Sequence, residues 1–191
     1  MDFHTLCIGC RTYRRFKQKQ IPEEVLDELL ENARIANSAM NGQPLRYVLV
    51  KNPEAVRKIQ PCFHFAAALP KELGQPKEGE QPAAFIILCT EGPETPWTGI
   101  DIGIAVRTMN LNAYIHGVGS CIIGNVEFEK VNEILSIPET WIPRLALALG
   151  YPSHKSTIVE LPEDGSVKYY LDEERQYHVP KRKWKDISII R

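Results

Sequence analysis

A basic run near the start of the chain has the composition of a phosphate-binding segment. It reads Arg11-Thr12-Tyr13-Arg14-Arg15-Phe16, so a threonine hydroxyl stands between guanidinium groups. Guanidiniums and hydroxyls together suit a phosphate monoester. A phosphate dianion partly removed from water needs about two or three cations. A second basic run, Lys181-Arg182-Lys183, supplies them only if the fold brings the far end of the chain back; the alternative is a solvated charged segment.

A metal site is the second chemistry that residue types suggest. Cys7 and Cys10 form a C-x-x-C pair, and Cys62 with His64 adds two potential ligands. Zinc prefers four such ligands in a tetrahedral arrangement. No second C-x-x-C pair is present, so a zinc-bearing interaction module stays an alternative and we expect no metal.

The glycine-rich run Gly117-Val-Gly-Ser-Cys-Ile122 fits neither of two common motifs. A dinucleotide fingerprint needs a third glycine where Ile122 stands, and it follows a strand, whereas this run follows a helical pattern. Ser120 between Gly119 and Cys121 lacks the spacing of a hydrolase nucleophile elbow. We therefore expect neither a Rossmann site nor a serine hydrolase.

The composition indicates one globular domain over residues 1–191. The chain is 43% apolar and 25% charged, which is ordinary for a protein with a buried core. A formal net charge of -1 favours neither nucleic acid nor a membrane as partner. The first residues lack the layout of an export signal and the five cysteines are odd in number, so we expect a cytoplasmic protein with reduced thiols.

Hydrophobic patterning predicts the elements that must position these residues. Helices are expected from Pro22 to Ala33, from Pro53, over 99–116 and near 128–135. Strands are expected over 46–51, 83–89 and 144–150, with loops or turns over 36–44, 69–82, 91–98 and 117–125. The order lacks a strict strand-helix-strand rhythm, which favours an α+β fold.

Two segments predict contact with another surface. The helix over 99–116 is apolar on most faces, as expected for a helix in the centre of an assembly. The last 39 residues hold few apolar clusters before Trp184 and Ile187-Ser-Ile-Ile190, so this end needs another surface to cover it.

Taken in order, four segments resemble motifs of the FMN-dependent nitroreductase family over nearly the whole chain. The matches are the basic run from Cys10 to Phe16 with its Pro22 helix; Asn37-Ser-Ala-Met-Asn-Gly-Gln-Pro-Leu45; the helix from near Asp101 with Gly117-Val-Gly-Ser-Cys-Ile-Ile-Gly124; and Leu149-Gly-Tyr-Pro152 with Pro180-Lys-Arg-Lys183. Any one motif is weak, but their order is specific.

The resemblance implies a three-layer α/β/α sandwich with a central, mostly antiparallel sheet. It also implies an intertwined homodimer, in which the C-terminal extension over about 153–191 reaches across the partner subunit. That arrangement would cover the apolar residues at the end of the chain.

The resemblance further implies an FMN site built from two subunits. Arg11, Thr12 and Arg14 would hold the phosphate and ribityl oxygens, and Lys181 and Arg182 would complete the phosphate site. From the partner subunit, Ser38, Ala39 and Asn41 would meet the isoalloxazine, with Gln43 supporting their turn. Ile123 and Gly124 would lie along the ring near N5 and offer backbone donors to the reduced flavin's negative charge.

The activity implied is that of an FMN-dependent NAD(P)H oxidoreductase with a ping-pong hydride mechanism. NADH or NADPH would reduce the flavin, and a nitroaromatic, quinone or similar small oxidant would then enter the same pocket; the cofactor carries the chemistry, so no side chain is named as a catalytic acid or base. The alternatives are a flavin-binding reservoir or sensor without turnover, and a flavin-fragmenting or dehalogenating relative.

Three departures from the family pattern stand out. Cys10 occupies the position where the family commonly has its first arginine, and Asn37 and Leu45 replace the usual proline and tryptophan. The loop over 91–98 is short, so the helical lid that larger members place over the substrate is not expected.

Overall fold

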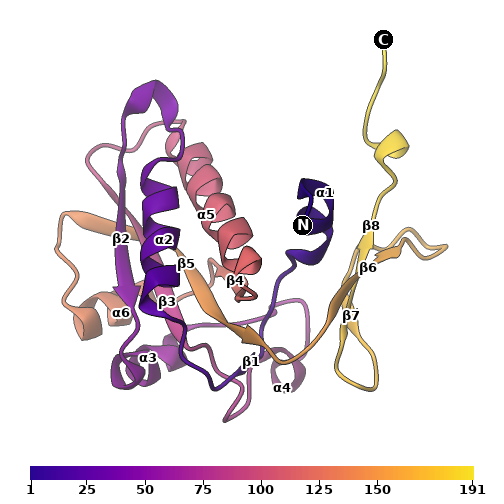
Figure 1. The fold of residues 1–191 in the computed structure, drawn as a ribbon, viewed down its shortest axis with the longest axis horizontal. Helices are drawn as coiled ribbons and strands as arrows, with labels where there is room; N and C mark the ends of the chain where they lie inside the picture. The colour runs from indigo at the N-terminus through magenta and orange to yellow at the C-terminus, as the bar shows by residue number, and fades with distance from the viewer.

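The chain folds into a five-stranded sheet between helices, with a smaller sheet at its C-terminal end (Figure 1). The structure is a computed structural model, and it describes residues 1–70 and 72–191. In chain order the helices are α1 (Phe3–Gly9), α2 (Glu23–Arg34), α3 (Pro53–Ile59), α4 (Lys71–Gly74), α5 (Thr98–Ile115) and α6 (Phe128–Leu135), with short 3₁₀ turns at Ala39–Asn41, Gln60–Cys62 and Trp184–Asp186. The strands are β1 (Phe16–Lys17), β2 (Leu45–Val50), β3 (Ala84–Glu91), β4 (Gly119–Ile123), β5 (Trp141–Pro152), β6 (Ser156–Glu160), β7 (Tyr170–Leu171) and β8 (Tyr177–Lys181).

The main sheet has the order β1-β5-β3-β2, with β4 also paired to β5, and all of its pairs are antiparallel. Strand β3 is buried on both faces because its side chains alternate between two cores. Phe85 and Ile87 pack with α3 and α6, whereas Ile86 and Leu88 pack with α2 and α5. The predicted α+β class and three-layer sandwich are confirmed.

Strand β4 corrects the prediction of a glycine-rich turn over 117–125. Its five residues pair in register with β5, from Gly119 opposite Gly150 to Ile123 opposite Ala146. The short apolar run supplies a strand because Cys121 and Ile123 face the α3–α6 core. On its other edge β4 forms a parallel bridge between Ser120 and Thr12. The basic run is thereby held beside β4, and Tyr13 N–H donates to the Ser120 carbonyl at 2.9 Å.

Gly119 allows this close approach because it has no side chain. A Cβ built there would lie 2.8 Å from the Tyr13 ring and 2.5 Å from Pro152. We expect Gly119→Ala to lower the free energy of unfolding by about 1–3 kcal/mol, as overpacking of a filled core does. Gly99→Ala is the matched control, since nothing lies within 4 Å of a Cβ there. Equal urea midpoints for the two variants would show that the Tyr13 ring can move aside without loss of unfolding free energy.

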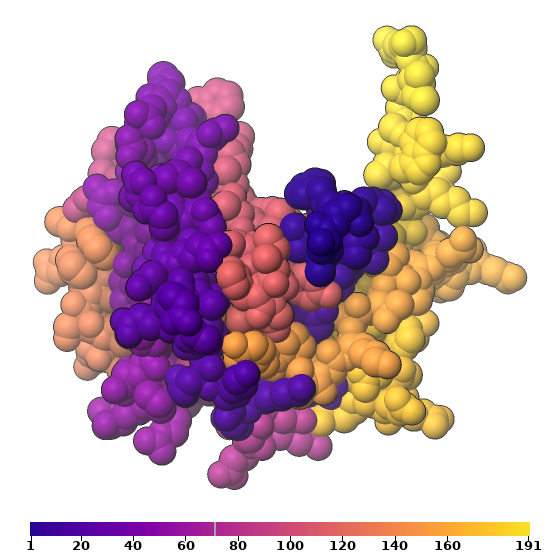
Figure 2. All heavy atoms as spheres, in the orientation of Figure 1, coloured from indigo at the N-terminus to yellow at the C-terminus, as the bar shows by residue number. Residues whose placement is uncertain are grey.

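Residues after β5 form a second sheet of order β6-β8-β7, which the sequence patterning did not predict. Two features anchor this sheet. The side chain of Tyr177 on β8 is buried, with 1% of its surface exposed. The Arg175 guanidinium forms two hydrogen bonds with the Glu80 carboxylate, at 2.8 and 3.1 Å. The helix α4 likewise interrupts the predicted loop over 69–82. Beyond β8 the chain projects clear of the rest of the molecule (Figure 2), and Ile189 and Ile190 are 82% and 81% exposed.

Helix α5 is not buried all round within one chain. Ile100, Ile104 and Ile115 are exposed, because the sheet and α2 cover only part of its surface. All five cysteines are free. Within the described residues, no helix is both long enough and apolar enough to cross a membrane.

Candidate functional site

A small polar cavity lies where the basic run meets β4 and α5. We call it the β4-edge cavity; it has a volume of about 140 Å³ and is lined by Cys10, Arg11, Thr12, Arg107, Asn110, Ser120 and Ile122. A water molecule occupies roughly 30 Å³ in the liquid, so the cavity admits a phosphate-sized group. It is too small for a ring system, since pockets for larger ligands start at roughly 300 Å³.

A hydrogen-bond network fixes the wall of this cavity. The Cys10 thiol donates to Asn110 Oδ1 at 3.0 Å, and the Arg107 guanidinium donates to the same oxygen. The Asn110 amide in turn donates to Ser120 Oγ. Because Ser120 Oγ accepts that bond, its own proton is free to donate into the cavity. Burial raises the pKa of the Cys10 thiol although the nearby Arg107 guanidinium opposes the rise, so Cys10 stays a neutral donor.

The cavity concentrates positive charge without a carboxylate to balance it. Arg11 and Arg107 both line it, and neither forms an ion pair with any described residue. The Arg11 Nε is buried and has no hydrogen-bond partner. A buried donor without a partner is costly, which makes an anion the expected occupant. A phosphate monoester, with its several acceptor oxygens, fits this donor set.

The free edge of β4 adds backbone donors next to the cavity. Since the Ser120 carbonyl accepts from Tyr13, Ser120 directs its backbone groups away from β5. Strand residues alternate, so Ile122 also directs its N–H to the free edge, whereas Ile123 directs its N–H toward Ala146 on β5. Ile122, which lines the cavity, therefore offers its N–H to the free edge, and Gly124 follows at the end of the strand. Contact of Ile123 and Gly124 with a flavin stays a prediction.

Three other residues expected at the phosphate lie elsewhere in the single chain. The Arg14 guanidinium stacks on the rings of Tyr169 and Tyr177, 4.7 and 4.8 Å from their centroids, and its Nε is buried without a partner. Lys181 ends β8, and Arg182 follows it where the chain leaves the second sheet. None of the three lines the β4-edge cavity.

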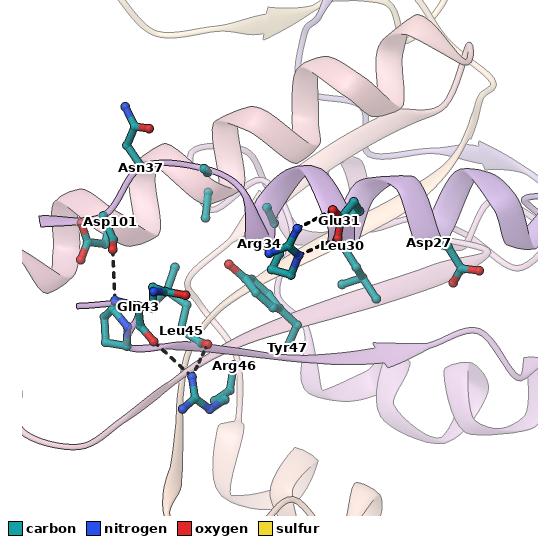
Figure 3. Close-up of a pocket in the computed structure, with 15 residues that line it drawn as sticks. Asp27, Leu30, Glu31, Arg34, Asn37, Gln43, Leu45, Arg46, Tyr47 and Asp101 are labelled. Atoms are coloured by element: carbon teal, nitrogen blue, oxygen red, sulfur yellow. Dashed lines mark hydrogen bonds and ion pairs between the residues drawn. The ribbon is translucent and has the colours of Figure 1, made fainter. Parts of the chain in front are cut away.

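A second cavity, which we call the α2–β2 cavity, lies between α2, β2 and the start of α5 (Figure 3). Its volume is about 490 Å³, within the usual range for small-molecule sites. Ser38 and Gln43 line it, whereas Ala39 and Asn41 belong to the same turn but not to the lining. The Arg46 guanidinium donates to the carbonyls of Gln43 and Leu45 and so ties this turn to β2.

The turn carrying these residues is held in an unusual backbone conformation. Met40, Asn41 and Gln43 have φ values of 52°, 53° and 47°, although none of them is glycine. Such φ values cost energy and cluster at functional sites. The buried Asp101 carboxylate accepts from Ala39 N–H at 2.9 Å, which anchors the turn to α5.

The two cavities lie on nearly opposite faces of α5. Asp101 and Ala105 border the α2–β2 cavity, and Arg107 and Asn110 border the β4-edge cavity. At about 100° per residue, Ala105 and Arg107 point in nearly opposite directions. One chain therefore does not bring the predicted residues together, and a ligand touching both groups would need a second chain.

Sequence reasoning missed Arg107, Asn110, Ser120 and Asp101. A signal for two of them was present: Asp101 and Arg107 are the only charged residues of the helix α5. A charge in such a helix requires a partner or a function. The zinc alternative finds no support, since no group of three or more metal-ligating side chains gathers within the described part of the chain.

Comparison with known proteins matches the model of the Nitroreductase family to residues 9–151, which include both cavities. The chain belongs to the nitroreductase family. The predicted membership and the enzyme class, an oxidoreductase, are thereby confirmed. The second sheet and the projecting end fall outside the matched residues.

Three individual proteins show how this family member compares. A protein of Methanothermobacter thermautotrophicus named "Putative NADH dehydrogenase/NAD(P)H nitroreductase" is 30% identical over 150 residues, covering 75% of this chain and 73% of that protein. An "FMN reductase (NADPH)" of Bacillus subtilis is 27% identical over 159 residues, covering 76% and 64%. A nitroreductase family protein of Streptococcus pneumoniae shares the fold, with a TM-score of 0.68 and 20% identity over 87% of this chain and 99% of that one.

Proposed function

We propose that the protein is an FMN-dependent NAD(P)H oxidoreductase that reduces nitroaromatics, quinones or similar small oxidants. The observation that carries the proposal is the β4-edge cavity: in a nitroreductase family member, it gathers two arginines and two hydroxyls with no carboxylate. The names of relatives, which include an FMN reductase and an NAD(P)H nitroreductase, support the same cofactor and electron donor.

In this proposal the chain's own residues bind and orient the cofactor. Arg11, Thr12 and Ser120 would hold the phosphate, and the free N–H groups at Ile122 and Gly124 would face the flavin. Bound FMN would supply hydride transfer from NADH or NADPH and two-electron transfer to the oxidant. Backbone dipoles that are already oriented stabilise negative charge without reorganising.

A homodimer would complete the site. Ser38, Ala39, Asn41 and Gln43 of one subunit would then approach the flavin held by the other, and Lys181 and Arg182 would add charge to the phosphate. Support comes from the exposed isoleucines of α5 and from the apolar residues at the projecting end, since exposed apolar clusters of this kind mark interaction surfaces. We propose that residues 1–191 form one such FMN-binding unit, with the segment after residue 152 crossing the partner.

Steady-state oxidation of NADH and NADPH by the FMN-loaded protein, with a quinone as acceptor, tests the activity. We expect quinone-dependent turnover above that of free FMN at the same concentration. Flavin retention without quinone-dependent turnover would instead favour the flavin reservoir or sensor.

A further inference from the structure

We propose that Arg107, on α5, binds the phosphate group of FMN together with Arg11. This inference rests on the proposed function, and it assigns a phosphate-binding role to a residue outside the basic runs. Arg107 and Arg11 come from segments about a hundred residues apart, and the fold brings both to the β4-edge cavity.

The position of the Arg107 guanidinium is fixed by two neighbours on the cavity wall. Its Nη1 lies 3.5 Å from Cys10 Sγ, and it donates to Asn110 Oδ1 one turn further along α5. A guanidinium carries five N–H donors, and these contacts occupy few of them. The remaining donors are available to the cavity that Arg107 lines.

The short Cys10 side chain makes this position possible. Cys10 is 3% exposed, and its thiol points at Asn110. A longer side chain at residue 10 would compete with the Arg107 guanidinium for the same space. The small side chain at position 10 thus leaves space in the cavity, and Arg107 on α5 places a positive charge there.

Arg107 and Arg11 differ from the arginines of this molecule that pair with a carboxylate, and these two unpaired guanidiniums line the same cavity. Arg34, Arg46, Arg144 and Arg175 each pair with a glutamate, whereas no described residue pairs with Arg107 or Arg11. Two guanidiniums sharing one small cavity repel each other unless an anion lies between them. A phosphate dianion accepts from both, and arginine is well suited to it because the planar fork binds two oxygens.

Arg107 could alternatively serve only to hold Asn110 and Cys10 in place. The two roles differ in which ligand they affect. Loss of a phosphate contact weakens FMN and spares riboflavin, which has the same ring and ribityl chain but no phosphate. Loss of cavity structure weakens both flavins.

The experiment measures dissociation constants for FMN and for riboflavin by quenching of flavin fluorescence in the unchanged protein and in Arg107→Met. We expect the variant to bind FMN about 10- to 150-fold more weakly, the range for losing one charge-assisted hydrogen bond. Riboflavin binding should be unchanged. Arg57→Met on α3 is the matched control, because Arg57 is exposed and lies on the other face of the sheet.

Arg107→Lys keeps the charge but not the planar fork of the guanidinium, so its FMN affinity should lie between those of the unchanged protein and Arg107→Met. Inorganic phosphate should compete with FMN more weakly in Arg107→Met than in the unchanged protein. Equal losses for FMN and riboflavin, or FMN affinity equal to that of the unchanged protein, would overturn the assignment. If the unchanged protein binds neither flavin, the proposed function itself fails, which is a distinct result.

Discussion

Replacing Arg11 with methionine should weaken FMN binding by about 10- to 150-fold. The Arg11 Nε is buried without a partner beside the β4-edge cavity, so a bound phosphate gives it the acceptor that the protein does not. Removing a charge-assisted contact costs about 1.5–3 kcal/mol, which is the source of that range. Retention of FMN through dialysis and gel filtration, followed by titration, measures the effect.

Lys17→Met provides the control for Arg11→Met. Lys17 is also a cation near the start of the chain, but it lies on β1 and borders a different cavity. Its loss changes the net charge by the same amount and should leave FMN affinity unchanged. Equal FMN affinities for both variants would refute the assignment of Arg11 to the phosphate.

Stability should fall steeply as the pH drops from about 6.5 to about 4, because of His154. This side chain is 7% exposed, and burial lowers its pKa to about 4, with Arg14 and Arg15 nearby acting in the same direction and Glu80 opposing. The ring is therefore neutral at pH 7. Its Nε2 accepts from Arg14 N–H at 3.0 Å, and its Nδ1, 2.9 Å from the Lys155 carbonyl, donates to that oxygen.

The direction of the effect follows from which state binds the proton. Between about pH 6.5 and 4 the unfolded chain protonates His154 and the folded chain does not, so acid favours unfolding in this window; above it the contribution of His154 to stability is constant. Each tenfold change in proton affinity corresponds to about 1.4 kcal/mol, which gives a loss of about 3 kcal/mol over the whole window.

His154→Gln isolates this contribution. Its amide oxygen can accept from Arg14 N–H but does not titrate, so the difference in unfolding free energy between the two proteins should shrink as the pH falls. Urea unfolding at pH 8, 6 and 5 measures it. Parallel pH dependence in the two proteins would show that another group causes the acid loss.

The sequence allowed the fold class to be predicted because its strongest signals are local. The run from Ala84 to Cys89 is apolar throughout because both faces of its strand are buried, and α2 is amphipathic because one of its faces is buried. In both elements the types of neighbouring residues are enough to predict which positions are buried. Strand β4 was missed for the opposite reason. Its glycines indicate a turn, yet Gly119 is required by Tyr13, a neighbour about a hundred residues away in the chain.

The site was predictable only in part, for the same physical reason. The basic run carries Arg11 and Thr12 together, so a local pattern indicated phosphate. Arg107 reaches the same cavity through packing of α5 against the basic run and β4, and no local pattern encodes that contact. Arg14 shows the converse: it lies in the predicted motif but stacks on tyrosines of the C-terminal segment.

The most direct test of the account is the visible absorption spectrum of the FMN-loaded protein during anaerobic titration with NADH, with sizing of the same sample. The account predicts about one FMN per chain in a dimer, and loss of the flavin absorption as NADH is added, because the bound cofactor accepts the hydride. Colourless protein that cannot be loaded with FMN would contradict the cofactor assignment. Yellow protein whose spectrum neither NADH nor NADPH changes would contradict the proposed activity.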